Sequence, residues 1–546
     1  MRQEPALDRA LLFCNGAVLT SDPRRPVARA VAVSEGRIVG LDDEALAWRS
    51  RGATEVDLAG GCLVPGFRDG HIHPLWGGVE LGQAPLVGAR SIAEIVDRVR
   101  AYAEANPGLE WIEGGGYDPS LLPAGIGEAA TLDAAVRDRP VVLEASDHHT
   151  MWVNSEALRR AGIDGETPDP PLGRILRRGD GSPIGTLVEW DALAMMRRHI
   201  PPATLEERQE GLARAMRELA RAGITWVQEA SATLDDVDVY GAAARSGGLT
   251  SRVNIALRAE PSRWSRDRAG FVERRGELAR AADSSEVLQA QTIKFFADGV
   301  IEMGTGYLLE PYDDAPHTCG LPNWSPEELS DAVTAFDADR FQIHIHAIGD
   351  GGVRMALDAI EAAAARNGPR DRRPVIAHTQ VVQGVDRSRF ASLGVIANFE
   401  PLWACLDPTM QELTLPRLGP ARSALQYPIA SIARAGARIS FGSDWPVSSM
   451  HPLHGLAVAV TRQNRDGKPS GGWLPEERLP IAQALAAYTA GTAYQGFEDD
   501  RGGVIAEGRR ADLCALSDDI SAMAGLEIAD VAVTGTWTGG REVHGS

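Results

Sequence analysis

The central part of the chain alternates short apolar segments with longer segments of helical pattern. Eight apolar segments are rich in Val, Ile and Phe, and most are followed by a helical stretch such as residues 351–368. This alternation is typical of a parallel α/β barrel, in which each strand is followed by a helix that covers it. The pattern therefore predicts an α/β fold with a (β/α)8 TIM barrel. Its eight predicted strands are residues 62–67, 223–230, 251–259, 291–299, 340–350, 373–380, 394–401 and 437–444.

The two ends of the chain have a different texture, with short alternating strands separated by turns. Residues 10–65 and the segments ADLCALS and DVAVTGTWTGGREVHG share this pattern. We expect both ends to form one small β-sandwich domain, residues 1–65 with 498–546, around a barrel of residues 66–497. The first two predicted barrel strands are separated by far more chain than one crossover needs. We therefore expect an inserted α/β subdomain at about residues 75–210.

Composition limits the classes of partner and the compartment. The formal net charge is −20, which disfavours nucleic acid and anionic membranes as partners. No apolar run is long enough to span a membrane, and the first residues do not resemble a signal peptide. The five cysteines are scattered and odd in number, which fits a reduced, cytoplasmic protein. A small-molecule substrate is the expected partner, and a homodimer is left open.

The first candidate metal ligands are His71 and His73, in GFRDGHIHP. Residues i and i+2 of a strand point to the same face, so both imidazoles can reach one metal ion. Two surface histidines are the simpler interpretation of this pair. The position favours the metal site, because the pair follows an apolar strand, where barrel active sites lie.

Lys294 is a second candidate, because it lies between Ile293 and Phe295 in a chain that has only two lysines among 55 basic residues. A buried ammonium is costly unless it is paired or neutralised. A neutral lysine can react with carbon dioxide to form a carbamate, an anionic ligand able to bridge two metals, whereas arginine stays protonated. The alternative is a structural ion pair with Asp298 or Glu302.

Three further candidates end later predicted strands: His346, His378 and Asp444. His344 shares the strand face of His346, and only one of these two need be a ligand. Strand ends of a barrel converge on one mouth. Together with His71, His73 and Lys294 they form a set of nitrogen and oxygen ligands that suits zinc or another divalent first-row metal, as one or two ions.

With these motifs in place, the sequence resembles the amidohydrolase superfamily, in particular its amidohydrolase family 3 branch of YtcJ-like proteins and N-substituted formamide deformylases. The resemblance covers nearly the whole chain and follows the order of the family's motifs. These are VPGFRDGHIHP, DHHTMWVNSEAL, IKFFADGVIE, LLEPYDD, HIHAIGD, IAHTQ, FGSDWPV, YTAGTAYQ and GRRADLCAL.

The resemblance implies roles for individual residues. It implies that Lys294 is the carboxylated bridging lysine and that Asp444 is both a ligand and the general acid/base. It also implies that His71, His73, His346 and His378 are ligands and that His149 faces the substrate. The chain departs from the branch at the end of the seventh predicted strand, where Glu400 stands in place of the usual glutamine. This carboxylate is expected either near the pocket, where it would favour a cationic amine, or outside it, supporting another site residue or paired with an arginine. The neighbouring His148 could compete for the role of His149.

These roles predict hydrolysis of a C–N bond in an amide-like small molecule by metal-activated water. Other chemistry at the same site stays open as an alternative: deamination, ester or carbamate hydrolysis, or an imine cyclase or lyase reaction. A non-catalytic metal-binding regulator is a third alternative. Several large or charged residues near the motifs are candidates for substrate contact, although the tryptophans among them could equally pack the barrel rim. They are Trp76, Trp152, Glu400, Trp403 and Trp445.

Overall fold

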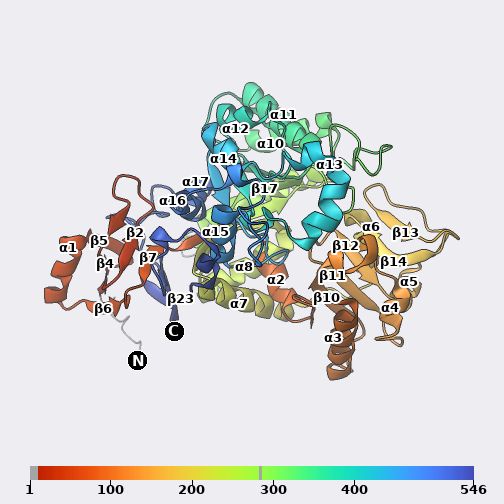
Figure 1. Cartoon of the computed structure of the whole chain (residues 1–546), viewed down its shortest axis with the longest axis horizontal. Coiled ribbons are helices and arrows are strands. Elements are labelled where there is room, and N and C mark those ends of the chain that lie inside the picture. The colour runs from red at the N-terminus through yellow and green to blue at the C-terminus, as the bar shows by residue number, and fades with distance from the viewer. Residues whose placement is uncertain (1–9, 282–285, 546) are drawn as a thin grey trace.

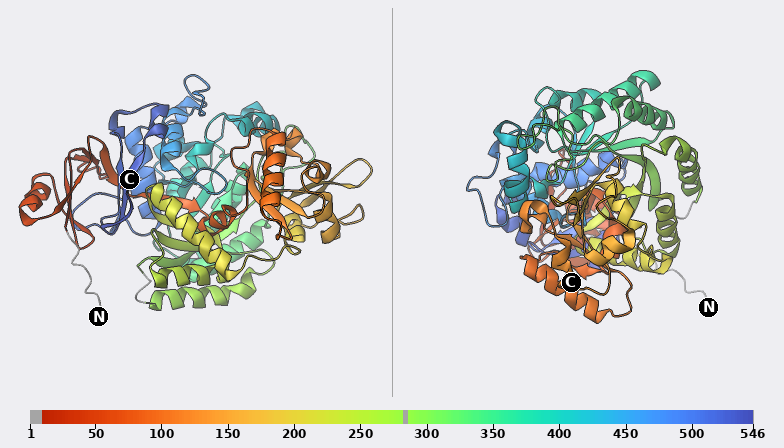
Figure 2. Two further views of the ribbon diagram at one scale, coloured as in Figure 1. Left: turned by 90° about the horizontal axis from the view of Figure 1, so that it is seen from below. Right: turned by 90° about the vertical axis from the view of Figure 1, so that its right-hand side faces the viewer.

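The computed structural model describes residues 10–281 and 286–545, so residues 1–9 and 546 of the predicted end domain lie outside the described residues. Its centre is an eight-stranded parallel sheet that curls into a barrel (Figures 1 and 2). The predicted barrel is thereby confirmed. Its strands are β8 (Phe67–Ile72), β15 (Ile224–Ala232), β16 (Arg252–Arg258), β17 (Leu288–Phe296), β18 (Gln342–Ala347), β19 (Val375–His378), β20 (Ile396–Phe399) and β21 (Ile439–Phe441).

Helices follow the barrel strands and cover the sheet, and their apolar faces pack into one large core with the strands. These helices are α7 (Leu205–Arg221), α8 (Leu234–Ser246), α9 (Trp264–Arg280), α10 (Pro326–Ala338), α11 (Asp350–Asn367), α12 (Arg387–Leu393), α13 (Leu415–Ser423), α14 (Ile429–Arg434), α15 (Pro452–Thr461), α16 (Ile481–Ala486) and α17 (Thr492–Gln495).

The first and last barrel strands meet through the loop that follows β21. The Asp444 amide donates to the His71 carbonyl at 2.7 Å, and the His73 amide donates to the Trp445 carbonyl at 2.9 Å. These two backbone hydrogen bonds hold His71 and His73 beside Asp444 without help from any side chain.

One predicted strand is corrected. The apolar pattern predicts the first barrel strand at residues 62–67, but β7 (Cys62–Pro65) pairs with strands of a separate sheet, and the barrel begins at β8. The chain passes between the two sheets at Gly66, where a side chain would lie 2.4 Å from Thr225. The apolar pattern runs through both strands, so periodicity alone could not separate them.

Residues from both ends of the chain form two further sheets at one side of the barrel (Figure 1). Their apolar residues share one core, in which Phe13 of the first sheet meets Trp537 of the second with ring centroids 4.9 Å apart. The first sheet contains β1 (Leu11–Cys14), β4 (Val31–Ser34), β5 (Arg37–Leu41) and β6 (Thr54–Asp57), with helix α1 (Asp42–Leu46) beside it. The second contains β2 (Ala17–Leu19), β3 (Val27–Ala28), β7, β22 (Leu513–Leu516), β23 (Val533–Thr538) and β24 (Arg541–Gly545).

A mixed six-stranded sheet with its own helices lies on the opposite side, between β8 and β15 in sequence (Figure 1). The domain boundaries predicted above stay proposals. None of the described helices is long and apolar enough to cross a membrane. The elements of this segment are α2 (Pro74–Glu80), β9 (Ala84–Pro85), α3 (Ile92–Ala105), β10 (Ile112–Tyr117), α4 (Ala129–Asp133), β11 (Val141–Ala145), β12 (Thr150–Val153), α5 (Ser155–Ala161), β13 (Arg174–Arg177), β14 (Pro183–Val188) and α6 (Trp190–Arg197).

Candidate metal centre and active site

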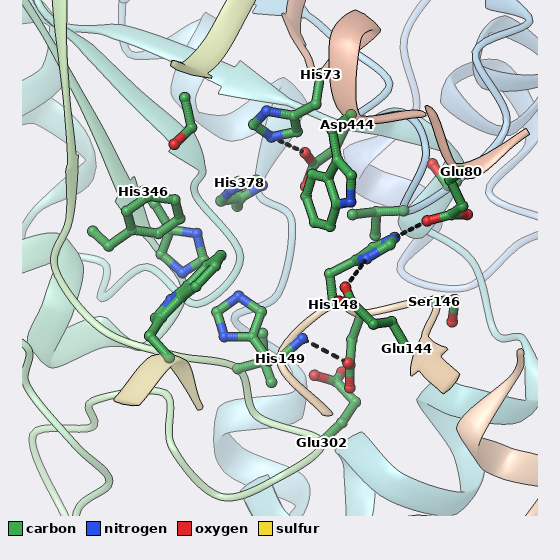
Figure 3. A pocket seen from close by; sticks show the side chains of 18 of the residues that line it. His73, Glu80, Glu144, Ser146, His148, His149, Glu302, His346, His378 and Asp444 are labelled. Carbon is green, nitrogen blue, oxygen red and sulfur yellow. Dashed lines mark hydrogen bonds and ion pairs between the residues drawn. The ribbon is translucent and has the colours of Figure 1, made fainter. Parts of the chain in front are cut away.

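A cavity of about 690 Å³ opens at the carboxyl ends of the barrel strands, between the barrel and the inserted segment (Figure 3). Its volume lies within the range of sites for small molecules. Its floor carries the histidines and the aspartate predicted from sequence, and its outer wall carries residues of the inserted segment. Lining residues include His71, His73, His148, His149, His346, His378 and Asp444.

The centre of the cluster is formed by His71, His73 and Asp444, whose ligand atoms all lie within 4.8 Å of one another. Asp444 Oδ1 is 3.0 Å from His73 Nε2 and 3.6 Å from His71 Nε2. Burial raises the pKa of a carboxyl group, but the hydrogen bond from His73 and nearby cationic groups hold the pKa of Asp444 below its ordinary value. Two imidazole nitrogens and one carboxylate oxygen at this spacing fit a first-row divalent metal.

Lys294 joins this group from β17, with its Nζ 3.0 Å from His71 Nε2. Its side chain is fully buried. Burial lowers the pKa of the Lys294 ammonium to about 7, although nearby carboxylates act in the opposite direction. The alternative ion pairs with Asp298 and Glu302 are not among the ion pairs of the described residues. Asp298 instead accepts from backbone amides, and Glu302 accepts from Thr414. The position of Lys294 therefore fits a metal ligand better than a partner in a structural ion pair.

The remaining histidines lie around His71. The His378 ring is 4.7 Å from the His71 ring and 4.5 Å from the His346 ring, between centroids. His346 Nε2 donates to the Gly299 carbonyl at 3.2 Å, so in this conformation His346 stands outside the compact group of three. His344 lies deeper, with its Nε2 2.9 Å from His71 Nδ1. This contact positions the His71 ring and leaves His71 Nε2 directed at Lys294 and Asp444.

Buried carboxylates stand behind two of the histidines. Glu229 Oε1 is 3.3 Å from His73 Nδ1, and the other carboxylate oxygen accepts from the Tyr240 hydroxyl. Glu400 Oε2 is 2.9 Å from His378 Nδ1. Such contacts fix the tautomer and orientation of a metal-binding histidine. Sequence reasoning missed the role of Glu229, although a charged residue inside an apolar strand could have indicated it.

The position of Glu400 favours a supporting role over substrate contact. The sequence predicts it among the substrate contacts, but it is fully buried behind His378 and is not among the lining residues of the cavity. Burial raises the pKa of Glu400, and the charge and hydrogen bond of His378 oppose that effect. The carboxylate therefore orients the His378 ring and does not reach the cavity.

Replacing Glu400 with glutamine is expected to lower the affinity for divalent metal by about 10- to 100-fold, the usual cost of losing an outer carboxylate. Glutamine preserves shape and can still accept from His378 Nδ1, so only the charge is lost. Chelator-competition titrations would measure the change. The matched control is Glu477→Gln, because Glu477 is also buried but bonds Ser431. Unchanged metal affinity in Glu400→Gln would contradict the assignment of Glu400 as a partner of His378. A loss of activity toward cationic amides that neutral amides do not share would also contradict it.

Two neighbouring histidines of the inserted segment face the cavity through different partners. His149 Nδ1 is 2.8 Å from Glu189 Oε2. Burial opposes the charged imidazole, but the carboxylate of Glu189 raises the pKa of His149 to about 9. His148 lies between Glu144 and Glu80, 3.1 Å and 3.5 Å away (Figure 3). His149 lies next to the candidate metal ligands, 5.7 Å from His346 between ring centroids, which favours it over His148.

The predicted tryptophans divide into two groups. Trp76 and Trp403 line the cavity, and Trp403 stacks on His378 with 5.3 Å between centroids. Trp152 and Trp445 do not line it. Trp152 is buried in the core of the inserted segment, with its Nε1 donating to the Glu128 carbonyl at 2.9 Å.

Trp445 packs so closely on Gly77 that a side chain there would lie 2.4 Å from the indole. The predicted substrate contacts of Trp152 and Trp445 therefore find no support in their positions. Trp190, which sequence reasoning missed, lines the cavity beside His149 with ring centroids 5.4 Å apart.

A parallel barrel that gathers histidines, a lysine and an aspartate at its strand ends defines the class of barrel hydrolases with a metal centre. The family comparison gives the particular group. The model of the amidohydrolase family matches residues 54–544, and the chain belongs to this family.

Relatives in this family are similar over nearly their whole lengths. The Arabidopsis thaliana protein LONG AFTER FAR-RED 3 is 32% identical, over 98% of this chain and 91% of its own length. YtcJ of Bacillus subtilis (strain 168) is 29% identical, over 90% of this chain and 91% of its own length. The N-substituted formamide deformylase of Arthrobacter pascens is 26% identical, over 97% and 98%. These matches confirm the resemblance carried by the motifs.

A solved structure shares the fold. An uncharacterized metal-dependent hydrolase of Pyrococcus horikoshii superposes with a TM-score of 0.74 at 23% identity, covering 94% of this chain and 99% of that one.

Proposed function

We propose that this amidohydrolase-family chain cleaves the C–N bond of a small amide-like molecule, of the N-substituted formamide or N-acyl amine type. The observation that carries the proposal is the group of His71, His73 and Asp444 at the floor of a cavity of small-molecule size. The formamide deformylase of Arthrobacter pascens, which is similar over nearly the full length, supports the choice of bond.

The proposed cofactor is zinc or another divalent first-row metal, as one or two ions. Its holders would be His71, His73, His346, His378, Asp444 and a carboxylated Lys294. A metal bound by such a set polarises a carbonyl group and lowers the pKa of water.

Side chains of the protein supply proton transfer, a hydrogen bond to the carbonyl oxygen and the apolar walls of the site. Asp444 accepts a proton from the attacking water and returns it to the leaving nitrogen, as the C–O bond forms and the C–N bond breaks. The products are a carboxylic acid and an amine. His149 faces the same space and would donate a hydrogen bond to the carbonyl oxygen as negative charge develops on it. Trp76 and Trp403 offer apolar walls for the substituent of the substrate.

The test is a panel of N-formyl and N-acyl amines, each paired with the ester of the same acyl group, assayed with metal-loaded protein. Cyclic imines complete the panel. We expect release of free amine, with loss of activity on chelation and recovery on adding metal back. Turnover of esters or imines alone by fully metallated protein would replace the proposal with other chemistry on this site. No turnover of any compound by such protein would favour a binding or regulatory role.

The remaining proposals concern the binding partner, the cellular compartment and the oligomeric state. A small molecule is the proposed partner, without nucleic acid or membrane, and the cytoplasm is the proposed compartment. A homodimer stays an open prediction.

A further inference from the structure

Glu189, at the end of the inserted segment, lies directly opposite His149. Strands β12 and β14 pair antiparallel with Thr150 opposite Val188, so the next pair toward the cavity is His149 with Glu189. The Glu189 amide donates to the His149 carbonyl at 2.8 Å, which continues the ladder by one step. The two side chains therefore leave the sheet side by side.

Both oxygens of the Glu189 carboxylate are engaged. Oε2 is 2.8 Å from His149 Nδ1, and Oε1 accepts from the Thr305 hydroxyl. The residue is 3% exposed. A Cβ atom added at Gly299 would lie 2.2 Å from Oε1, so the barrel loop after β17 closes tightly over the carboxylate. These contacts leave the carboxylate no freedom to rotate.

The backbone of Glu189 is strained. Its φ of 69° and ψ of 163° fall in a region that glycine alone occupies without steric cost. Such a conformation persists only where the surrounding structure enforces it, and strained residues concentrate at functional sites. A glycine would satisfy the backbone better, so the side chain is the feature that justifies glutamate here.

We propose that Glu189 is a positioning residue for His149. Its carboxylate accepts a hydrogen bond from the Nδ1–H of His149 and thereby leaves Nε2 as the atom that meets the substrate. The imidazole points into the cavity on the side of His346 and His378 (Figure 3). Since Thr305 belongs to the barrel, the same carboxylate ties this part of the inserted segment to the catalytic face. The inference rests on the proposed function for its catalytic consequence, but its geometric content is independent of the substrate.

The central experiment is Glu189→Gln, read in two ways. The first is the nitrogen NMR signature of His149, which we expect to move from a doubly protonated ring, with Nδ1–H held by Glu189, toward a mixture with neutral forms. The second is steady-state kinetics, where kcat should fall by about 10- to 100-fold with little change in KM. Metal content should stay at the wild-type level.

Three further variants separate positioning from mere structure. Glu189→Gly should lose at least as much activity as Glu189→Gln while its melting temperature stays equal or rises, because the backbone strain is relieved. In a His149→Ala background, Glu189→Gln should cost nothing more. Glu144→Gln serves as the spectroscopic control, because it should perturb the signals of His148 and leave those of His149 in place.

An unchanged His149 signature in Glu189→Gln, or an equal further loss of kcat in the His149→Ala background, would overturn the inference. A shifted signature in a protein that hydrolyses no amide would instead refute the proposed function and leave the positioning role standing.

Discussion

Lys294→Arg is expected to lose both bound metal and turnover. Lys294 Nζ lies 3.0 Å from His71 Nε2 in a fully buried position. Arginine would place a permanent, larger cation against His71 Nε2. Because Lys294 is proposed as a direct ligand and not as an outer partner, the loss of metal affinity should exceed about 100-fold.

The same variant tests the proposed carbamate. In that reaction the neutral amine nitrogen of Lys294 attacks the carbon of carbon dioxide. The new N–C bond forms as one C=O π bond of carbon dioxide opens onto its oxygen and one proton passes from the nitrogen to solvent, so the product is an anionic carbamate. Arginine has no neutral amine under these conditions, so the anionic ligand cannot form. Labelled carbon dioxide should therefore give a carbamate carbon signal in wild-type protein and none in Lys294→Arg.

The chain provides its own control, since only one other lysine is present. Lys468 is exposed in a surface loop, and Lys468→Arg should retain full metal content and activity. Elemental analysis of the purified variants, together with turnover per protein, would check both expectations. A Lys294→Arg protein with normal metal content would remove Lys294 from the ligand set.

The barrel and much of the candidate site follow from sequence for simple physical reasons. Buried parallel strands are apolar along their length, so a polar residue at the end of such a run, like His378 or Asp444, is conspicuous. The i, i+2 spacing of His71 and His73 is enough to give their side chains a common direction on a strand. These signals come from residues that are close together in the chain, so a single sequence is enough to recognise them.

The residues that hold the site in place give no such signal, because their partners are distant. Glu229 meets His73 across 156 residues and Glu189 meets His149 across 40. Nothing in either segment indicates which histidine its carboxylate will contact. The same applies to Glu400: its sequence position at a strand end predicts a place in the cavity, but its carboxylate turns behind His378.

Side-chain direction explains why Trp152 lies away from the cavity. In β12 the residues alternate between two faces, and Trp152 has the opposite parity to His149. Its face packs into the core of the inserted segment, where its indole nitrogen bonds a backbone carbonyl. The alternation of side chains along the strand can be read from the sequence. The sequence does not show that the face of Trp152 packs into the core.

Asp444→Asn is expected to retain the fold and much of the metal while losing turnover by about 10²- to 10⁴-fold, the usual cost of removing a general acid/base. The backbone argument favours asparagine as the test residue. Asp444 has a φ of 55°, in the left-handed region that asparagine adopts more readily than most residues. Its amide donates to the His71 carbonyl, a bond that any non-proline residue keeps.

The side-chain argument separates binding from chemistry. An asparagine oxygen can still lie beside His73 Nε2, where Asp444 Oδ1 now lies at 3.0 Å. It cannot take a proton from water and return it to the leaving nitrogen. The measurement is kcat per bound metal ion, with metal content and melting temperature determined on the same sample. If turnover per metal ion stays near that of the wild type, the proton is carried by another group, and His149 is the first residue in the cavity to test for that role.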